Sequence, residues 1–198
     1  MQNSPIRMES SRLVARCWRE EDAEDFRALL DRNDRHLRPF IQWMRDEPMT
    51  LDGTRQRLAG YRGRFLAGED FRYALLDSNE QLVGELMLST RSGGGSRELG
   101  YLLDQSSTGR GLATEAARLG LWAAFKKSGV GQVELFCAPE NRASIRIAEK
   151  LGFTLLETLP AHGKDSEGEL RDAMHWRITA AEYSGQHHEP GFRVSETD

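Results

Sequence analysis

The sequence predicts an α/β protein built on one mixed β-sheet with helices on both of its faces. Strand-like segments come first as a series, and the second half of the chain then alternates strands with helices. An apolar strand at 99–103 passes through a polar turn and a glycine-rich loop into a helix rich in Ala and Leu. The chain has 198 residues, of which 38% are hydrophobic, and this suits one domain with a buried core.

The first third of the chain predicts one strand and two helices. Residues 11–18 alternate apolar and polar side chains, which favours a strand. The acidic segment 19–22 is typical of a first helical turn, and apolar residues follow it at helical spacing. Pro39 interrupts the next segment because proline ends or kinks a helix. A second helix is expected from Thr50 to about Leu66.

The remaining segments predict a three-stranded antiparallel meander, followed by strands that alternate with helices. This gives a sheet of about seven strands. Residues 1–10 are expected to form a loose arm, 11–182 a single domain, and 183–198 a frayed polar tail. The expected elements after the second helix are strands 71–77, 81–90 and 97–103, a helix 111–127, a strand 132–138, a helix 141–151, a strand 153–159, a polar loop 162–169 and a strand 170–179.

Composition excludes several classes of protein. The net charge is −4 with acidic and basic residues interspersed, so no surface for nucleic acid is expected. No segment approaches the ~18–20 apolar residues of a membrane span, and the first residues lack the apolar core of a secretory signal. Cys17 and Cys137 both lie in apolar strand-like segments, so we expect buried free thiols in a cytoplasmic protein and no metal site.

The glycine-rich stretch 108–114 predicts a site for an anion. Glycine lets the backbone approach a ligand closely and adopt positive φ angles. The start of a helix leaves N–H groups without intrahelical partners and adds partial positive charge at the same place. A phosphate-bearing ligand is therefore expected here. The stretch has neither the Gly-Lys-Ser/Thr of a P-loop nor the Gly-x-Gly-x-x-Gly of a dinucleotide fold.

Four pieces of the sequence stand out, in this order: Arg12-Leu-Val-Ala-Arg16 with Glu21-Asp-Ala23, Glu98-Leu-Gly-Tyr-Leu-Leu-Asp104, Thr108-Gly-Arg-Gly-Leu-Ala-Thr-Glu-Ala116 and Asn141-Arg-Ala-Ser-Ile-Arg-Ile-Ala-Glu-Lys-Leu-Gly-Phe153. Together they resemble the GNAT superfamily of N-acetyltransferases and specifically its RimJ/RimL-like branch. The resemblance implies the GNAT fold, in which the sheet splays apart at its central strands. It also implies acetyl-CoA as the co-substrate and no metal.

The resemblance implies where the coenzyme would bind. Its pantetheine arm would lie along the strand edge at 101–103, and a backbone N–H near Leu102 would polarise the thioester carbonyl. Thr108 departs from the family pattern, which has Gln or Arg at this position, and Arg110 could supply the missing charge. The implied coenzyme-binding residues are Tyr101, Leu102, Leu103, Thr108, Gly109, Arg110, Gly111, Leu112, Ala113, Thr114, Asn141 and Ser144.

The reaction implied by the resemblance is direct attack of an amine on the thioester, which needs a base and an acid. Glu98, on the central strand, is the first candidate for the base, and Glu85 is a weaker one. Glu98 could equally be a structural glutamate. Most GNAT enzymes place a tyrosine where this chain has Ala148. The branch resembles a site with a serine in that helix, so Ser144 is the candidate acid, or else a serine that only bonds backbone.

The acceptor side is less defined by the sequence. Phe40 and Trp43 fall in the part that forms the acceptor wall in this fold, and His162 falls in a polar loop on the same side. These three residues are the candidates for substrate contact. The acceptor would be a protein N-terminus or a small-molecule amine. The alternative is a non-catalytic acyl-CoA-binding or regulatory module on the same fold. Dimers are common in this branch, so a homodimer stays possible.

Overall fold

The computed structural model describes residues 4–90, 95–186 and 192–195 and contains one mixed sheet of nine strands. The strands are β1 (Arg7–Glu9), β2 (Leu13–Cys17), β3 (Phe71–Asp77), β4 (Leu82–Ser89), β5 (Ser96–Leu103), β6 (Gln132–Cys137), β7 (Thr154–Lys164), β8 (Leu170–Thr179) and β9 (Arg193–Ser195). Their order across the sheet is β7-β8-β6-β5-β4-β3-β2-β1-β9. The predicted mixed, mostly antiparallel sheet is confirmed, with β5–β6 its one parallel pair among the described residues.

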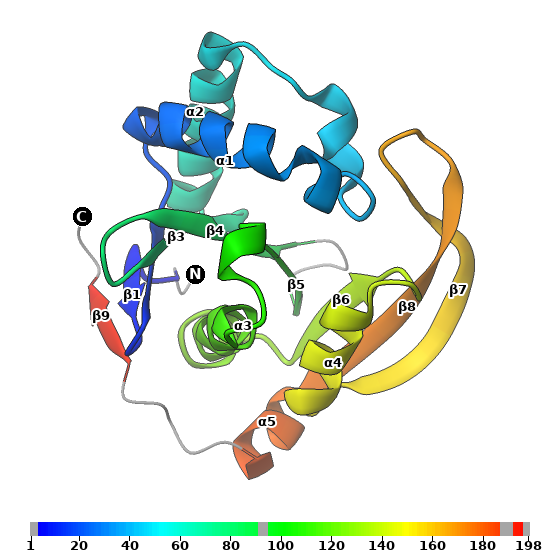
Figure 1. The fold of residues 1–198 in the computed structure, drawn as a ribbon. Helices are drawn as coiled ribbons and strands as arrows, with labels where there is room; N and C mark the ends of the chain where they lie inside the picture. Colours follow the sequence, from blue (N-terminus) through cyan, green and yellow to red (C-terminus); the bar gives the residue numbers. More distant parts are fainter. Residues whose placement is uncertain (1–3, 91–94, 187–191, 196–198) are drawn as a thin grey trace.

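Helices cover both faces of the sheet (Figure 1). Helices α1 (Ala23–Leu37) and α2 (Leu51–Leu66) pack over one face and enclose a core cluster that includes Trp18, Phe26 and Leu58. The opposite face carries α3 (Leu112–Trp122), which continues as a π-helical turn (Ala123–Lys127), and α4 (Arg142–Lys150). The short α5 (Ala180–Gln186) follows β8. The apolar residues at helical spacing therefore pack against the two faces of the sheet, as the sequence pattern predicts.

The sheet opens between its central strands. The parallel pairing of β5 with β6 runs from Ser96 opposite Gln132 to Glu98 opposite Glu134 and ends there. On its other side β5 stays paired with β4 as far as Leu103. The backbone edge of residues 99–103 that faces β6 is thus left without a strand partner in the described part of the chain. The splay that the family resemblance implies is confirmed.

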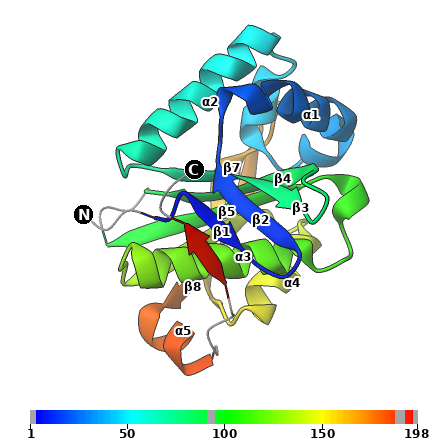
Figure 2. The same ribbon diagram turned by 90° about the vertical axis from the view of Figure 1, so that its left-hand side faces the viewer.

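The two ends of the chain correct the predicted arm and tail (Figure 2). Residues 7–9 form β1 instead of a loose arm, and β9 pairs with β1 instead of fraying. The buried Tyr73 hydroxyl donates to Ser4 Oγ at 2.7 Å and to the Pro5 carbonyl at 3.1 Å, which docks the first described residues. A buried tyrosine needs such partners. These two short strands raise the count from about seven to nine, while 187–191 and 196–198 lie outside the described residues.

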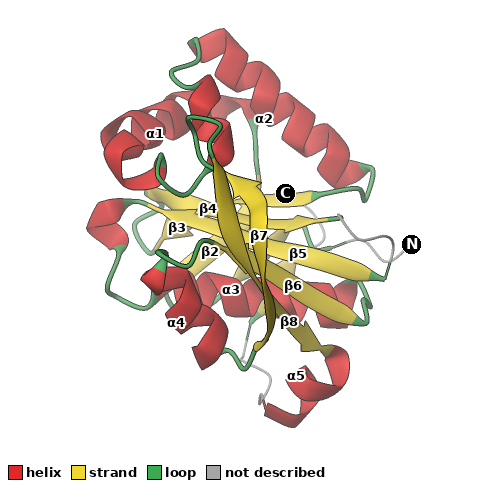
Figure 3. Cartoon of the chain, turned by 90° about the vertical axis from the view of Figure 1, so that its right-hand side faces the viewer, coloured by secondary structure: helices red, strands yellow, loops and turns green. Residues whose placement is uncertain are grey.

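A second correction concerns the loop expected at 162–169. Strand β7 continues to Lys164, and its register with β8 shifts between Leu159 and Gly163. This irregularity is a bulge, which leaves residues outside the ladder and re-aims their side chains. Figure 3 shows the resulting β7–β8 hairpin rising from the sheet toward the connection between α1 and α2. His162 therefore lies on a bulged strand and not in a loop.

None of the helices in the described part of the chain combines the length and the apolar composition that crossing a membrane requires.

Candidate active site

Two cavities meet at the splayed end of β5. The loop cavity, of about 420 Å³, lies between the glycine loop and α4. The hairpin cavity, of about 570 Å³, lies between the β7–β8 hairpin, the segment 39–46 and the sheet. Six residues line both: Phe40, Ile41, Tyr101, Leu102, Asn141 and Ser144. A ligand in one cavity can therefore reach a ligand in the other across Tyr101 and Ser144.

The loop cavity gathers the residues predicted to hold the coenzyme, with the exception of Arg110. It also contains residues that the sequence reasoning missed, above all Arg146 and Lys150 on α4. Both carry positive charge toward a site expected to hold phosphates. A signal for them exists, because Ala143, Arg146 and Lys150 recur at helical spacing and so share one helix face. His36, near the end of α1, also lines this cavity.

The glycine loop has the backbone geometry of an anion site. Gly109 and Gly111 adopt φ angles of +73° and +79°, which side chains rarely tolerate. Gly111 is the N-cap residue of α3, whose first N–H groups lack intrahelical partners. The Thr108 hydroxyl donates to the Gln105 carbonyl at 2.7 Å, so the side chain that replaces the family's long donor is used within the turn.

The turn before the glycines is held by α1. Arg32 Nε donates to Asp104 Oδ2 at 2.6 Å, and Asn33 Oδ1 accepts from Gln105 N at 2.8 Å. Burial alone would raise the pKa of Asp104, but the hydrogen bonds from Ser106 and Arg32 lower it below its ordinary value. The strand-to-loop transition is thus fixed by charged and amide side chains that lie some seventy residues earlier in the chain.

A hydroxyl pair marks the junction of the cavities. The Tyr101 hydroxyl donates to Ser144 Oγ over 3.4 Å, and Asn141 Oδ1 caps α4 by accepting from Ser144 N at 3.1 Å. Burial raises the pKa of Tyr101, so the phenol stays protonated and remains a donor. Since Ser144 Oγ accepts from Tyr101, its own proton can be donated elsewhere. The sequence assigned Tyr101 only to the coenzyme strand and missed this contact.

The two candidate bases differ in their surroundings, although both line the hairpin cavity. Glu85 accepts from Trp18 Nε1 at 3.1 Å and from Arg72 Nη1 at 3.1 and 3.2 Å. These donors hold Glu85 as a structural carboxylate. Glu98 is buried on β5 opposite Ser89 of β4 and Glu134 of β6, beside the point where the strands part.

The hairpin forms the far wall of the hairpin cavity. His162 stacks on Phe136 with ring centroids 5.7 Å apart, and His175 stacks on the same ring at 4.4 Å. Arg171 Nη1 donates to the Pro39 carbonyl at 2.9 Å and joins the hairpin to the segment 39–46. The predicted residues Phe40, Trp43 and His162 are therefore brought together, with Phe40 at the junction and the other two in the hairpin cavity.

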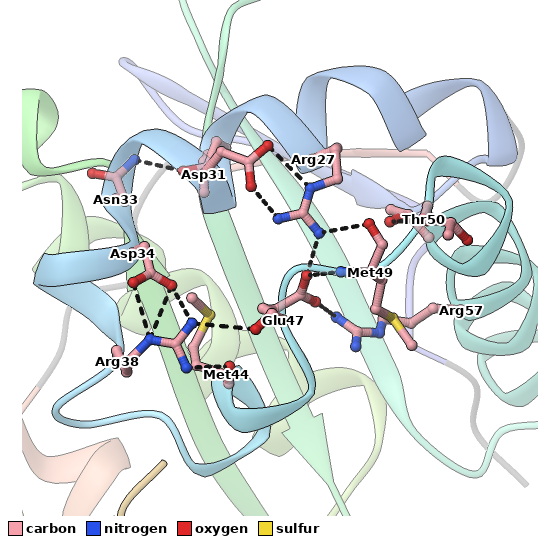
Figure 4. A network of polar contacts seen from close by, with 12 residues as sticks. Arg27, Asp31, Asn33, Asp34, Arg38, Met44, Glu47, Met49, Thr50 and Arg57 are labelled. Atoms are coloured by element: carbon pink, nitrogen blue, oxygen red, sulfur yellow. Dashed lines mark hydrogen bonds and ion pairs between the residues drawn. The ribbon is translucent and has the colours of Figure 1, made fainter. Parts of the chain in front are cut away.

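The segment 39–46 is anchored by Glu47, whose side chain is 1% exposed (Figure 4). Its carboxylate accepts from Arg27 of α1, from Arg57 Nη1 of α2 at 2.6 Å and from Met49 N at 2.9 Å. Burial alone would raise the pKa of Glu47, but these bonds and the charge of Arg57 lower it. The Arg57 guanidinium in turn lies 5.1 Å from the centre of the Trp43 ring. Sequence reasoning missed this network.

Cys137 lines the hairpin cavity as a free thiol. Burial raises its pKa to about 11. The thiol is therefore protonated near neutral pH and is a poor nucleophile. No group of three or more His, Cys, Asp or Glu side chains in the described ranges is arranged to hold a metal ion.

Comparison with known proteins agrees with this geometry. The acetyltransferase (GNAT) domain family matches residues 12–154, which is most of the chain. The chain belongs to the GNAT acetyltransferase family. A probable N-acetyltransferase of Bacillus subtilis, YjcK, is 30% identical over 135 residues, which are 67% of this chain and 75% of that protein. The family match and this relative support an N-acetyltransferase enzyme.

Solved structures with the same fold include ribosomal-protein acetyltransferases. RimL, a ribosomal-protein α-N-acetyltransferase in complex with coenzyme A, has a TM-score of 0.79 and 20% identity, covering 86% of this chain and 95% of that one. Mycobacterium smegmatis RimJ, also with a coenzyme A species, has a TM-score of 0.76 and 24% identity, covering 90% and 87%. The microcin self-immunity acetyltransferase MccE, with acetyl-CoA and AMP, has a TM-score of 0.77 and 16% identity, covering 86% and 93%.

Proposed function

We propose that this GNAT protein transfers the acetyl group of acetyl-CoA to a primary amine by direct attack of the amine on the thioester. The observation that carries the proposal is the junction of the two cavities at Tyr101 and Ser144. Acetyl-CoA would occupy the loop cavity and the amine the hairpin cavity. The acetyl carbon would then lie at the junction, where the reacting atoms are brought into one geometry.

The loop cavity supports a pyrophosphate ligand. The backbone N–H groups around Gly109 and Gly111 would bind the phosphate oxygens, with the dipole of α3 adding positive potential. Arg146 and Lys150 line the same cavity and would supply the charge that Thr108 does not. Structures of family members with coenzyme A or acetyl-CoA bound support this choice of co-substrate.

Two protons must leave the nitrogen of the ammonium, and one must reach the leaving sulfur. Glu98 would accept the first proton, directly or through a water, and the neutral amine nitrogen would then bond to the carbonyl carbon. The second proton would replace the one that Ser144 gives to the thiolate. A backbone N–H near Leu102, on the strand edge without a partner, would stabilise the oxyanion. When the carbon–sulfur bond breaks, Ser144 would protonate the leaving thiolate while Tyr101 supports its oxygen. The products are the N-acetylated amine and coenzyme A.

Two features favour direct attack over an acetyl-enzyme intermediate. Cys137 is the one cysteine that lines either cavity, and its pKa of about 11 keeps it protonated. The two cavities also share six lining residues, so a thioester in one and an amine in the other would lie close together. A covalent relay through the protein is therefore unnecessary.

The acceptor is assigned only as a class. A cavity of about 570 Å³ suits a small amine or the first residues of a peptide. Similar structures include acetyltransferases of ribosomal proteins and one in complex with acetyl-CoA and AMP, so this fold serves protein acceptors and can also bind a nucleotide besides acetyl-CoA. The alternative remains a non-catalytic acyl-CoA-binding module. A cytoplasmic location and a possible homodimer remain predictions from the sequence and the branch.

Two measurements test the proposal. A thermal shift with acetyl-CoA should show stabilisation, because a ligand that binds the folded state raises its stability. Thiol release from acetyl-CoA should then be followed across a panel of small amines and N-terminal peptides. Stabilisation together with amine-dependent thiol release supports the enzyme. Stabilisation without turnover above the hydrolysis background supports the binding module instead.

A further inference from the structure

Arg12, the residue before β2, contacts the glycine loop from outside the loop cavity. Arg12 Nη1 donates to the Arg110 carbonyl at 2.8 Å, and Arg12 Nε donates to Glu115 Oε2 at 2.7 Å. A methyl group added at Gly111 would lie 3.7 Å from Arg12 Nη2, so the guanidinium packs beneath the loop. Arg12 is absent from the lining of both cavities. It therefore acts on the loop without facing the ligand.

Glu115 completes this contact from the first turn of α3. Its side chain is 11% exposed, and it also accepts from Ser10 Oγ at 2.6 Å and from Arg12 N at 3.3 Å. A carboxylate near a helix start would repel a bound phosphate if its charge were not compensated. Arg12 forms an ion pair with Glu115 and so provides that compensation.

We propose that Arg12 is a positioning residue for acetyl-CoA: it fixes the Arg110 carbonyl and neutralises Glu115, so that the loop N–H groups stay directed at the pyrophosphate. This role rests on the proposed function of the loop cavity. Because the Arg110 carbonyl is held on the side away from the cavity, the adjoining amides are held toward it. The conformation that the ligand needs then exists before binding, which lowers the cost of binding.

The test compares two thioesters on the purified full chain. Arg12→Ala should bind acetyl-CoA about tenfold more weakly, the effect of losing a charge-assisted hydrogen bond and its ion pair. Its affinity for S-acetylpantetheine, which lacks the pyrophosphate, should match that of the wild type. Without ligand, the amides of residues 109–113 should exchange hydrogen faster in the variant. Arg12→Lys, which keeps the charge but not the two-pronged contact, should lose less affinity.

Arg7→Ala is the matched control, because Arg7 pairs with Glu9 on neighbouring β1 at 2.7 Å and lines neither cavity. Arg7→Ala should change the binding affinity for neither thioester. If Arg12→Ala loses affinity equally for both thioesters, or binds both as the wild type does, the role of Arg12 is overturned and the proposed function still stands. If Arg12→Ala is unfolded, the two thioester affinities of Arg12→Lys and the hydrogen exchange of its amides 109–113 test the role of Arg12 by the same criteria. A wild-type chain that binds no acetyl-CoA would overturn the proposed function itself.

Discussion

The two cavities that share β5 are built by different means. The loop cavity is organised by backbone features, namely a strand end, two glycines with positive φ angles and the starts of α3 and α4. The hairpin cavity is made from side chains of three distant parts of the chain: the segment 39–46, the sheet face and the β7–β8 hairpin. A backbone site suits one constant ligand, whereas a side-chain site can be changed residue by residue to suit different acceptors.

The largest effect is expected from Glu98→Gln, which changes the hairpin cavity and leaves the loop cavity intact. Loss of a general base should lower kcat by about 10²–10⁴-fold, with acetyl-CoA affinity unchanged. Steady-state kinetics with an accepted amine and a binding titration with acetyl-CoA measure the two effects. Glu134→Gln is the control, because Glu134 is equally buried opposite Glu98 but lines neither cavity. Equal losses in both variants would point to burial rather than chemistry.

Glu47→Ala should have the next largest effect, because it leaves Arg27 and Arg57 buried without their shared carboxylate. Removing one partner of a buried ion pair costs about 3–5 kcal/mol of stability, measured by denaturant unfolding. The KM for the amine should rise more than that for acetyl-CoA, since Trp43 packs on Arg57. Glu24→Ala, in an exposed pair with Arg55, should change stability by less than ~1 kcal/mol.

The same carboxylate should give stability a pH dependence. The folded-state pKa of Glu47 lies below its ordinary value of 4.5, so its contribution is present above that value and is lost as pH falls through the folded pKa. Unfolding free energies measured between pH 7 and pH 3 should therefore decline more steeply in the wild type than in Glu47→Gln. If the unfolding free energies of the two proteins decline in parallel with falling pH, Glu47 does not contribute to the acid sensitivity.

Ser144→Ala examines the junction, where the two sides meet. Turnover should fall about tenfold to a hundredfold, and acetyl-CoA affinity should change little. Tyr101→Phe should have a smaller effect, about two- to tenfold, because it removes only one long hydrogen bond to Ser144. Rates should be compared at saturating acetyl-CoA. A Ser144→Ala enzyme with the wild-type rate would exclude the serine as the acid.

Gly111→Ala should lower stability less than Glu47→Ala does and should act on the loop side alone. At a φ angle of +79° a side chain costs about 1–2 kcal/mol, which unfolding measurements detect. Acetyl-CoA should bind more weakly because the loop relaxes away from this conformation, while the hairpin cavity is unaffected. Gly63→Ala, in α2 with open space around the added methyl, should be neutral or slightly stabilising.

The contrast between the cavities also explains what could be predicted from the sequence. The meander, the glycine loop and the Asn141 helix are encoded locally, and each forms close to its predicted position. Asn141 does cap its helix, and Gly152 does take a positive φ angle after it. These motifs build one part of the loop cavity, which could be anticipated, whereas His36, Arg146 and Lys150 in the rest of its lining were missed.

The errors fall where the structure depends on pairing between distant segments. Strands β1 and β9 have three residues each, too few for a periodic signal, and they form only because they pair with each other and with β2. His162 was assigned to a loop because the bulge in β7 interrupts the strand pattern. Arg12 and Glu47 act through partners up to about a hundred residues away, which no local pattern indicates.

The pairing of β1 with β9 brings the first and the last described strands together at the sheet edge opposite the β7–β8 hairpin. Arg7 lies opposite Ser195 and Glu9 opposite Arg193, so the described backbone nearly closes into a ring. A short linker from Ser195 to the residues before β1 would close this ring and allow the chain to be opened elsewhere, for example at the β3–β4 turn. A label attached to β1 or β9 would lie at the edge of the sheet opposite the hairpin.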